Sequence, residues 1–374
     1  MNISKLTVTQ FRNYTAATVL LSQGTNIIYG NNAQGKTNLL ESIYVFCTGR
    51  SHRVSNSRDM ILNGETFARV DIEFSDDIRS YKGHIIIPES GKKTVVINDV
   101  PIKKISTIAD YINVVMFSPE DLSIIKDEPA QRRKFIDMAI CQIRPVYAGI
   151  LADYSKVLIQ RNAMLKSIKR GTAKQENIEV WDSKLLALSA RITMFRKGFI
   201  DTLTPYAAAI HSEIACEPLE LRYMPCSKDD IDTSSEPAVL NNITERLRSS
   251  IMRDIEAGNT SIGAHHDDLE AYIAGQNAKR FGSQGQQRSV VLSLKLGQTE
   301  IIKAQKGSYP VILLDDIMSE LDESRRRYLT GRIVDKQVIM TCTDRETAMD
   351  QAVADAHGEA AYFKVADRCV MRDL

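Results

Sequence analysis

Apolar and polar residues alternate through much of the first third of the chain, a pattern that predicts β-strands. Turn-forming residues separate these segments, and one stretch between them, residues 37–47, has apolar positions at helical spacing instead. We therefore expect a β-rich region to about residue 120 around a single helix. The predicted strands are residues 3–11, 25–30, 68–75, 83–88 and 93–99.

Helical spacing replaces alternation from Pro129 to about Cys216. Two apolar stripes recur every three to four residues, one within 146–169 and one within 181–199, and the polar residues 169–177 between them predict a turn. Stripes of this kind predict an antiparallel helical hairpin of about three heptads. The first stripe comprises Ile150, Leu151, Tyr154, Leu158, Leu165 and Ile168, and the second comprises Trp181, Leu185, Leu188, Ile192, Phe195 and Phe199.

The last part of the chain alternates between helical and strand patterns. A helix is predicted after Gly282, followed by a strand at 310–314, a second helix and a strand at 337–342, which together predict a parallel sheet. The polar residues 227–238 are expected to be a solvated linker before a helix that ends near Ala257. We therefore expect an α/β fold whose mixed or parallel sheet is interrupted by a short helical lobe. The expected segments are residues 1–128, 129–258 and 259–374.

The composition is that of a soluble globular protein with two or three domains. The chain has 374 residues, of which 43% are hydrophobic and 25% are charged. A net charge of +1 excludes a uniformly cationic surface but allows a local basic face. The six cysteines lack C-x-x-C spacing, which indicates reduced thiols and neither a zinc finger nor a disulfide framework. The sequence shows no signal peptide and no membrane-length apolar run, so a cytoplasmic protein without a membrane partner is expected.

The segment Gly30–Thr37, GNNAQGKT, matches the phosphate-binding loop G-x-x-x-x-G-K-[ST] and lies between a predicted strand and a predicted helix. In such a loop the backbone N–H groups surround a polyphosphate. Lys36 would contact the β and γ oxygens, and the hydroxyl of Thr37 would bind Mg²⁺. The alternative is a glycine-rich turn without a ligand. The candidate nucleotide-binding residues are Gly30, Asn31, Asn32, Ala33, Gln34, Gly35, Lys36 and Thr37.

A second motif, YPVILLDDIMSELD, occupies Tyr309–Asp322. Its apolar run is typical of a buried parallel strand, and two carboxylates follow at the carboxyl end, where open α/β sheets bind ligands. Asp315 is predicted to hold Mg²⁺ directly or through water. Asp316 is predicted to polarise the water that attacks the γ-phosphate, so Lys36, Asp315 and Asp316 are the candidate catalytic residues. The alternative is a strand that ends in an acidic turn.

A third motif, GSQGQQRSVVLS, places glycines and hydrogen-bonding residues before an apolar helix at residues 282–293. The sequence SQGQQ resembles the LSGGQ signature of ABC-type ATPases, and SELD at 319–322 resembles their D-loop. The resemblance implies that Ser283 and Gly285 contact the γ-phosphate of ATP held by a second copy of the chain. An ordinary cap on a buried helix is the alternative.

About 280 residues separate Lys36 from Asp315, and the helical hairpin lies in that interval. This layout resembles the SMC-like repair ATPases, in which an arm interrupts an ABC-type head. Further segments are similar to the RecF recombination-repair family, in order along nearly the whole chain. They are FRNY (11–14), GNNAQGKTNLLE (30–41), TGRSHR (48–53), FSPEDL (117–122), RRKFID (132–137), QRNAMLK (160–166), HHDDL (265–269), GSQGQQRS (282–289) and LLDDIMSELD (313–322).

The resemblance implies an ATP-dependent DNA-binding protein that acts in recombinational repair and in replication-gap and SOS processing. It would dimerise on ATP, help to load recombinase at single-strand gaps, and act with RecR and RecO type proteins on single-stranded, gapped or junction DNA. Segments 1–128 and 259–374 would be the two halves of the ATPase head, and Arg12 would lie near the nucleotide phosphates. Weak DNA-stimulated hydrolysis of ATP to ADP and phosphate is expected.

Two departures from the family pattern bear on these expectations. Residues 263–268 are GAHHDD where the family usually has GPHRDD, which puts a basic contact at His266 in doubt. Thr341, Cys342 and Thr343 follow the strand after the second motif, where ABC transporters carry a switch histidine. We therefore expect loose positioning of water and turnover on the order of one per minute or less, against roughly 10 per second for a typical enzyme.

The helical segment is locally basic. Residues 131–200 contain 14 Lys or Arg against 5 Asp or Glu, an excess that would attract a phosphate backbone without reading bases. The alternative is that long helices use these charges only for solvation. The candidate DNA contacts are Arg132, Arg133, Lys134, Arg161, Lys166, Lys169 and Arg170.

Three other interpretations of the sequence are less well supported. A metal site at His265–Asp268 is disfavoured, because adjacent residues on one strand face opposite sides. A transporter-coupled ATPase would share the phosphate loop and signature but has no obvious use for the helical insertion. An SMC-like, nucleotide-gated structural DNA protein of the cohesin type would need a coiled coil of hundreds of residues and a hinge, which this chain lacks.

Overall fold

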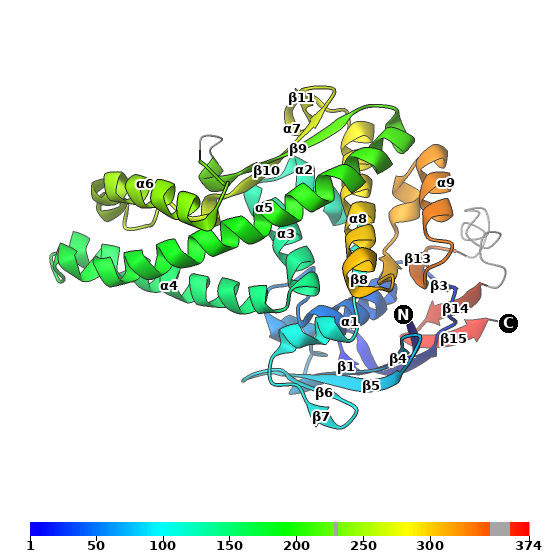
Figure 1. Cartoon of the computed structure of the whole chain (residues 1–374). Helices are drawn as coiled ribbons and strands as arrows, with labels where there is room; N and C mark the ends of the chain where they lie inside the picture. Colours follow the sequence, from blue (N-terminus) through cyan, green and yellow to red (C-terminus); the bar gives the residue numbers. More distant parts are fainter. Residues whose placement is uncertain (228–230, 345–359, 374) are drawn as a thin grey trace. The chain divides into compact units, whose positions relative to one another are not determined.

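The computed structural model describes residues 1–227, 231–344 and 360–373, so residues 228–230 of the predicted linker lie outside it (Figure 1). The chain forms two compact units. The first comprises Met1–Asp121 together with Lys295–Leu374, and the second comprises Leu122–Leu294. Within the described residues, no helix combines the length and the hydropathy needed to span a membrane.

An antiparallel sheet in the first unit has the strand order β2-β1-β4-β5-β6-β7. Its strands are β1 (Asn2–Phe11), β2 (Tyr14–Leu20), β4 (Phe67–Ser75), β5 (Ser80–Pro88), β6 (Thr94–Ile97) and β7 (Val100–Pro101). The predicted strands of this region are confirmed. The sequence analysis missed β2, because its YTAATVL sequence has small and polar residues where a half-buried strand usually has large apolar ones.

The second sheet of this unit has the order β15-β14-β3-β13-β12-β8. Its strands are β3 (Thr25–Tyr29), β8 (Val114–Phe117), β12 (Val311–Leu314), β13 (Val338–Cys342), β14 (Ala361–Ala366) and β15 (Cys369–Asp373). All neighbouring pairs are parallel except β14 with β15. The carboxyl ends of the parallel strands therefore meet at one edge, which is where ligands bind in open α/β sheets.

Helix α1 (Lys36–Thr48) lies in the core of the first unit. Its residues Leu39, Leu40, Ile43 and Phe46 are fully buried in one apolar cluster with side chains from both sheets. Burial on this scale fixes the start of the helix relative to strand β3, which precedes it. The other helical segments of the unit are η1 (Ser57–Met60), η2 (Ile105–Asp110), η7 (Ile317–Glu320) and α9 (Glu323–Arg332), while η3 (Pro119–Leu122) and α8 (Gln284–Lys306) cross the unit boundaries.

The second unit is built mainly of helices, of which α4 and α5 are long and run side by side with α6 against them (Figure 1). Helix α4 has the predicted bounds, and α5 continues well beyond the predicted apolar stripe. The helical segments are α2 (Ser123–Lys126), α3 (Pro129–Ile143), α4 (Val146–Lys169), η4 (Gln175–Ile178), α5 (Glu179–Ala215), η5 (Pro225–Ser227), α6 (Glu236–Ala257), η6 (Ala264–His266) and α7 (Ala278–Phe281).

A three-stranded sheet completes the second unit, in the order β11-β10-β9. Its strands are β9 (Leu219–Met224), β10 (Asp268–Ile273) and β11 (Gln276–Asn277). The pairing of β10 with β9 places residues 259–294 in the helical unit, whereas the sequence analysis assigned them to the second half of the head. Strand pairing over this distance leaves no local signal in the sequence from which this division could have been predicted.

Candidate functional site

The loop Gly30–Thr37 joins β3 to α1 and has the backbone of a phosphate cradle. Gly30, Ala33 and Gly35 have φ angles of 149°, 64° and 110°. A Cβ atom at Gly30 would lie 2.3 Å from the carbonyl oxygen of Val365, and one at Gly35 would lie 2.6 Å from the Asn13 amide nitrogen. Both positions therefore require glycine, because of the backbone conformation and because of the close neighbours.

Lys36 lies over this loop. Its Nζ atom donates to the carbonyl oxygens of Gly30, at 2.6 Å, and Asn31, at 3.1 Å, and the side chain is buried. Asn31, Asn32 and Ala33 at the tip of the loop are exposed. A buried ammonium group that contacts only carbonyl oxygens is well placed to contact an anion held by the loop.

The end of β12 meets the start of α1 through one carboxylate oxygen. The hydroxyls of Thr37 and Thr341 each donate to Oδ1 of Asp315, at 2.8 Å in both cases. The hydroxyl oxygen of Thr341 also accepts a hydrogen bond from the backbone N–H of Asp316, at 2.9 Å. The structure thus brings together Thr37 and Asp315 from the two predicted motifs, and it adds Thr341 from β13.

Burial raises the pKa of the Asp315 carboxyl, although the hydroxyls of Thr341 and Thr37 oppose that rise. A nearby divalent cation would offset the cost of desolvating this charge. Hydroxyl and carboxylate oxygens are also hard ligands of the kind that Mg²⁺ uses, together with water and substrate phosphates. The described residues contain no cluster of three or more His, Cys, Asp or Glu side chains for a metal. Thr37 and Asp315 are therefore suitable ligands for an Mg²⁺ ion whose other ligands come from a bound nucleotide and water.

Arg12 lies beside this site, but its guanidinium is engaged within the protein. It forms two hydrogen bonds with the buried carboxylate of Glu41, at 2.8 and 2.6 Å, and a third with the carbonyl oxygen of Asp59. The next residue, Asn13, donates to the carbonyl oxygen of Gln34 in the phosphate loop. The residue after Arg12 therefore contacts the loop, while the Arg12 guanidinium itself is held by Glu41 on α1.

Ser283 and Gly285 belong to the second unit, whereas the phosphate loop belongs to the first. Ser283 caps α8 reciprocally with Gln286: the Ser283 hydroxyl oxygen accepts from the Gln286 N–H, and the Gln286 side-chain oxygen accepts from the Ser283 N–H. This is the capping box that SxxQ sequences form. The contacts of Ser283 are those of an ordinary helix cap. Its side chain nevertheless remains exposed.

Two of the candidate DNA contacts, Arg132 and Arg161, have side chains that are buried and paired within the protein. Arg132 forms a two-pronged ion pair with Asp268, at 2.5 and 3.0 Å. Arg161 is fully buried, and it donates to Asp182 at 2.6 Å and to the fully buried Asp254 at 2.9 Å. The acidic partners of these arginines, except Asp182, come from outside residues 131–200. The excess of Lys and Arg counted within residues 131–200 is therefore larger than the positive charge that this segment exposes at the surface.

The remaining candidate DNA contacts differ in how exposed their side chains are. Arg133 is half-buried and donates to the carbonyl oxygen of Asp267, and burial lowers its pKa. Lys134, Lys166, Lys169 and Arg170 are exposed. Lys169 donates to the carbonyl oxygen of Glu256, so its ammonium lies against the C-terminal end of α6. The exposed candidates at the end of α4 are thus Lys166, Lys169 and Arg170.

The segment His265–Asp268 is a structural junction of the second unit. His265 and His266 lie on the turn η6, not on a strand as the sequence analysis assumed, and their rings are 4.2 Å apart. His265 contacts the Tyr154 hydroxyl through Nδ1 and the Thr260 carbonyl through Nε2, and burial lowers its pKa to about 4. Asp267 accepts hydrogen bonds from the Arg196 side chain and from the Cys226 N–H.

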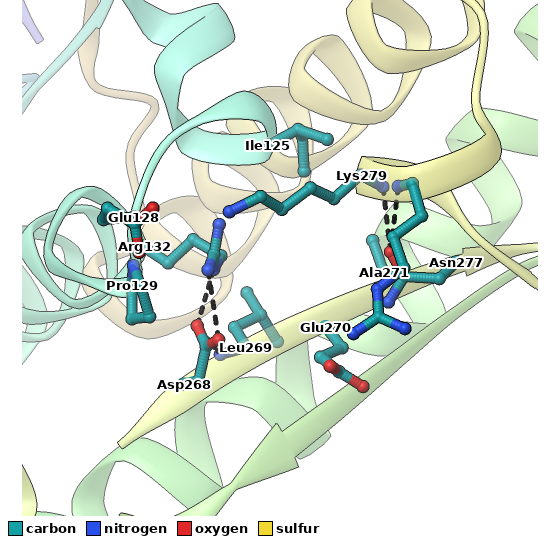
Figure 2. A pocket seen from close by; sticks show the side chains of 11 residues that line it. Ile125, Glu128, Pro129, Arg132, Asp268, Leu269, Glu270, Ala271, Asn277 and Lys279 are labelled. Carbon is teal, nitrogen blue, oxygen red and sulfur yellow. Dashed lines mark hydrogen bonds and ion pairs between the residues drawn. The ribbon is translucent and has the colours of Figure 1, made fainter. Parts of the chain in front are cut away.

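A pocket of about 210 Å³ opens beside this junction in the second unit. Figure 2 shows Arg132 and Asp268 pointing toward each other in this pocket, with the Lys279 side chain extending toward that pair. Lys279 donates to the carbonyl oxygen of Asp127. The pocket is smaller than the ~300 Å³ usual for small-molecule sites, and these two basic groups already have partners. We assign it no ligand.

Comparison with known proteins agrees with this fold. Residues 2–359 match the family model of the RecF/RecN/SMC N terminal domain, which gives the class of protein. The structure of an SMC head bound to the C-winged helix domain of ScpA has the same fold, with a TM-score of 0.55 at 16% identity.

The similarity to RecF proteins is much higher. The DNA replication and repair protein RecF of Acetivibrio thermocellus is 43% identical over 353 residues, which cover 92% of this chain and 94% of that protein. RecF of Geobacillus kaustophilus is 38% identical over 372 residues, 98% of both chains. A solved structure described as the recombination mediator protein RecF-ATPrS in the RecFOR pathway has a TM-score of 0.91 at 32% identity and covers 100% of this chain and 98% of that one. The chain belongs to the RecF family.

The sequence analysis missed two features of the site. Thr341 was noted only as standing where a switch histidine was absent, although a lone hydroxyl in the apolar strand VIMTC was a usable signal. The turn between β14 and β15 was also missed, and the Asp367 N–H donates to the Gln34 side chain of the phosphate loop, at 3.0 Å. The pair Asp367–Arg368 lacks the glycine or asparagine that usually indicates a two-residue hairpin turn, which is why the sequence did not reveal it.

Proposed function

We propose that this protein binds ATP with Mg²⁺ at Gly30–Thr37, hydrolyses it slowly, and acts on DNA in recombinational repair and replication-gap processing in the cytoplasm. The observation that carries the nucleotide assignment is the meeting of Thr37, Asp315 and Thr341 at the end of the phosphate loop. A RecF structure that is similar over the full chain was determined with ATP, which supports the same ligand here.

The residues of the site divide the work between binding and hydrolysis. The loop N–H groups and the positive end of the α1 dipole would bind the β- and γ-phosphates. Lys36 would exchange its contacts with Gly30 and Asn31 for phosphate oxygens. Asp316 would accept a hydrogen bond from the attacking water and orient it. Mg²⁺, when bound near Thr37 and Asp315, would supply positive charge that offsets the charge of the phosphates.

We propose further that Ser283 and Gly285 contact ATP held by a second copy, so that ATP drives formation of a homodimer. In the capping box the Ser283 oxygen accepts a hydrogen bond, which leaves its hydroxyl proton available for a phosphate oxygen. The first N–H groups of a helix have no partner within the helix, so those of Gln284 and Gly285 would also suit an anion. Ser283 and Gln284 are exposed, as such a contact requires.

The proposed partners are single-stranded, gapped or junction DNA and proteins of the RecR and RecO type. The RecF structure assigned to the RecFOR pathway supports these partners and a role in loading recombinase. A purely structural, SMC-like role is less well supported, because α4 has 24 residues and spans only about 36 Å, at about 1.5 Å per residue.

Sizing chromatography with light scattering tests the proposed function. The wild-type protein should be monomeric without nucleotide and dimeric with ATP and Mg²⁺, and gapped DNA should favour the dimer. Ser283→Arg should bind ATP and remain monomeric. The exposed Ser249 on α6 provides a control, since Ser249→Arg adds the same side chain away from the signature and should dimerise normally. Equal dimerisation of both variants would rule out the proposed role of Ser283.

A further inference from the structure

The hairpin formed by β14 and β15 places a charged turn beside the phosphate loop. Because β14 is parallel to β3, the turn at Asp367 and Arg368 lies at the same edge of the sheet as the loop. Two contacts hold the turn there. The Asp367 N–H donates to the Gln34 side chain at 3.0 Å, and Gly30 approaches the backbone of Val365 closely enough to exclude any side chain.

The backbone of this turn is unusual for its sequence. Asp367 and Arg368 have φ angles of 49° and 63°, the pattern of a two-residue hairpin turn that strongly prefers Asn-Gly or Asp-Gly. Arginine lacks the short side chain that makes the left-handed region tolerable for Asn and Asp, so its presence costs stability. Both side chains are exposed. Turn geometry alone therefore does not explain an arginine at this position.

The order of strands shows which end of a nucleotide the turn would meet. Asp315 and Asp316 follow β12 and Thr341 is on β13, so the γ-phosphate end belongs on that side of β3. Strand β14 adjoins β3 on the opposite side. A triphosphate that lies along the loop with its γ end near Asp315 would then have its nucleoside end nearer the β14 side.

We infer that Asp367 and Arg368 form the nucleoside subsite, an inference that rests on the proposed binding of ATP. The Asp367 carboxylate would accept hydrogen bonds from the ribose hydroxyls, a pairing that carboxylates make in other nucleotide sites. The Arg368 guanidinium is planar and weakly hydrated, and it would stack on the purine ring. The Gln34 side chain fixes the turn relative to the phosphate loop, so the phosphates and the nucleoside are bound by one rigid unit.

Equilibrium binding of two probes tests the role of Arg368. Inorganic tripolyphosphate carries the phosphates without the nucleoside, so Arg368→Ala should weaken ATP about tenfold, the loss of ~1.4 kcal/mol of stacking, and leave tripolyphosphate unchanged. Arg368→Lys keeps the charge but not the planar group, and it should also weaken ATP. The exposed Arg372 on β15 supplies a control, since Arg372→Ala should bind both probes as wild type does. Equal weakening of both probes would show that Arg368 contacts phosphate, and unchanged binding would remove it from the site.

A sugar-modified nucleotide tests Asp367 separately. The wild-type protein should prefer ATP to 2′,3′-dideoxyATP, and Asp367→Asn should reduce that preference to near equality while tripolyphosphate binding stays the same. A preference that survives the substitution would overturn the assignment of the ribose to Asp367. Lys36→Ala separates this inference from the proposed function. If wild-type protein binds ATP no better than Lys36→Ala does, the nucleotide assignment fails. If wild-type protein binds ATP better than Lys36→Ala does, and substitution of Asp367 or Arg368 changes nothing, only the nucleoside subsite fails.

Discussion

At the scale of single residues, one hydroxyl connects the two acidic residues of the site. Thr341 is buried in β13 and contacts both the Asp315 carboxylate and the Asp316 N–H. Asp316 has a φ angle of 48°, in the left-handed region, so its backbone needs such a contact to stay in place. In the proposed mechanism Thr341 would therefore be a positioning residue that acts through Asp315 and Asp316.

Substitution of Thr341 should separate turnover from binding. Thr341→Val keeps the shape of the side chain and removes both hydrogen bonds, and it should lower kcat for ATP hydrolysis about 10- to 100-fold, as the loss of supporting hydrogen bonds does in metal sites. The KM for ATP should change much less, because the phosphate loop is intact. Thr341→Ser should restore turnover. Steady-state kinetics would contradict this role if valine and serine were equally active, or if only KM rose.

Arg161 should be a stability residue and not a DNA contact. Arg161→Ala would leave the Asp254 carboxylate buried without its ion-pair partner, which should lower the free energy of unfolding by about 3–5 kcal/mol. The exposed Arg170 nearby is the control, and Arg170→Ala should change it by less than about 0.5 kcal/mol. Denaturant unfolding measures both values. Similar stabilities for the two variants would contradict the proposed importance of the buried pair.

His265 should make the second unit less stable at mildly acidic pH. Its pKa is lowered to about 4 in the folded protein, against 6.5 for the ordinary side chain, so the unfolded chain binds more protons between these values. Stability should be complete above pH 6.5 and fall as the pH decreases toward 4. His265→Asn keeps a donor and an acceptor but does not titrate, so its unfolding free energy should vary less between pH 5 and 7. His52 in the first unit has a similarly lowered pKa and should keep its contribution in that variant.

Residues differ in how far the sequence reveals their roles. The places of Gly30–Thr37 and of Asp315 and Asp316 at the ends of strands were predictable, because each motif is local and its neighbours in sequence define its place in the fold. The burial of Arg132 and Arg161 was not, because their partners Asp268 and Asp254 are 136 and 93 residues away. The contacts of Thr341 and Asp367 also depend on which strands become neighbours.

At the scale of elements, strongly periodic segments were predicted well and sheet neighbours were not. Helix α4 has the bounds that its apolar stripe predicted, and the strand before the phosphate loop motif, the helix after it and the strand before the acidic pair were also expected. Strands β8, β9, β10, β14 and β15 were not recognised in the sequence, because short apolar runs do not distinguish a strand from a buried loop or helix end. Their pairing decides where the units divide.

The exposed end of α4 carries the remaining prediction about DNA. Reversal of Lys166, Lys169 and Arg170 to Glu should weaken binding to gapped DNA and reduce the slope of log K against log salt by about three, one for each lost phosphate contact. A triple reversal of Lys92, Lys103 and Lys104, which are exposed in the first unit, changes the net charge equally and should leave the slope unchanged. Titrations at several salt concentrations would exclude the α4 surface if the two variants behaved alike.

At the scale of the whole molecule, the account depends on a site completed by two copies of the chain. The phosphate loop, the acidic pair and Thr341 belong to one unit, and the Ser283 edge of α8 belongs to the other. In a closed symmetric dimer each copy uses the same surfaces. The ATP-binding loop of each copy would therefore face the Ser283 end of α8 of the other copy, and the dimer would have two equivalent sites. Hydrolysis should therefore require dimer formation.

Mixing two inactive variants tests this central claim most directly. Lys36→Ala removes the phosphate contact and Ser283→Arg blocks the opposing edge, so each variant alone should hydrolyse ATP at background rate. A mixed dimer would contain one intact site, built from the loop of the Ser283→Arg copy and the Ser283 edge of the Lys36→Ala copy. The account predicts that mixing restores a measurable part of the wild-type ATPase rate. Activity that stays at background in the mixture, while both variants are folded and form mixed dimers, would contradict it.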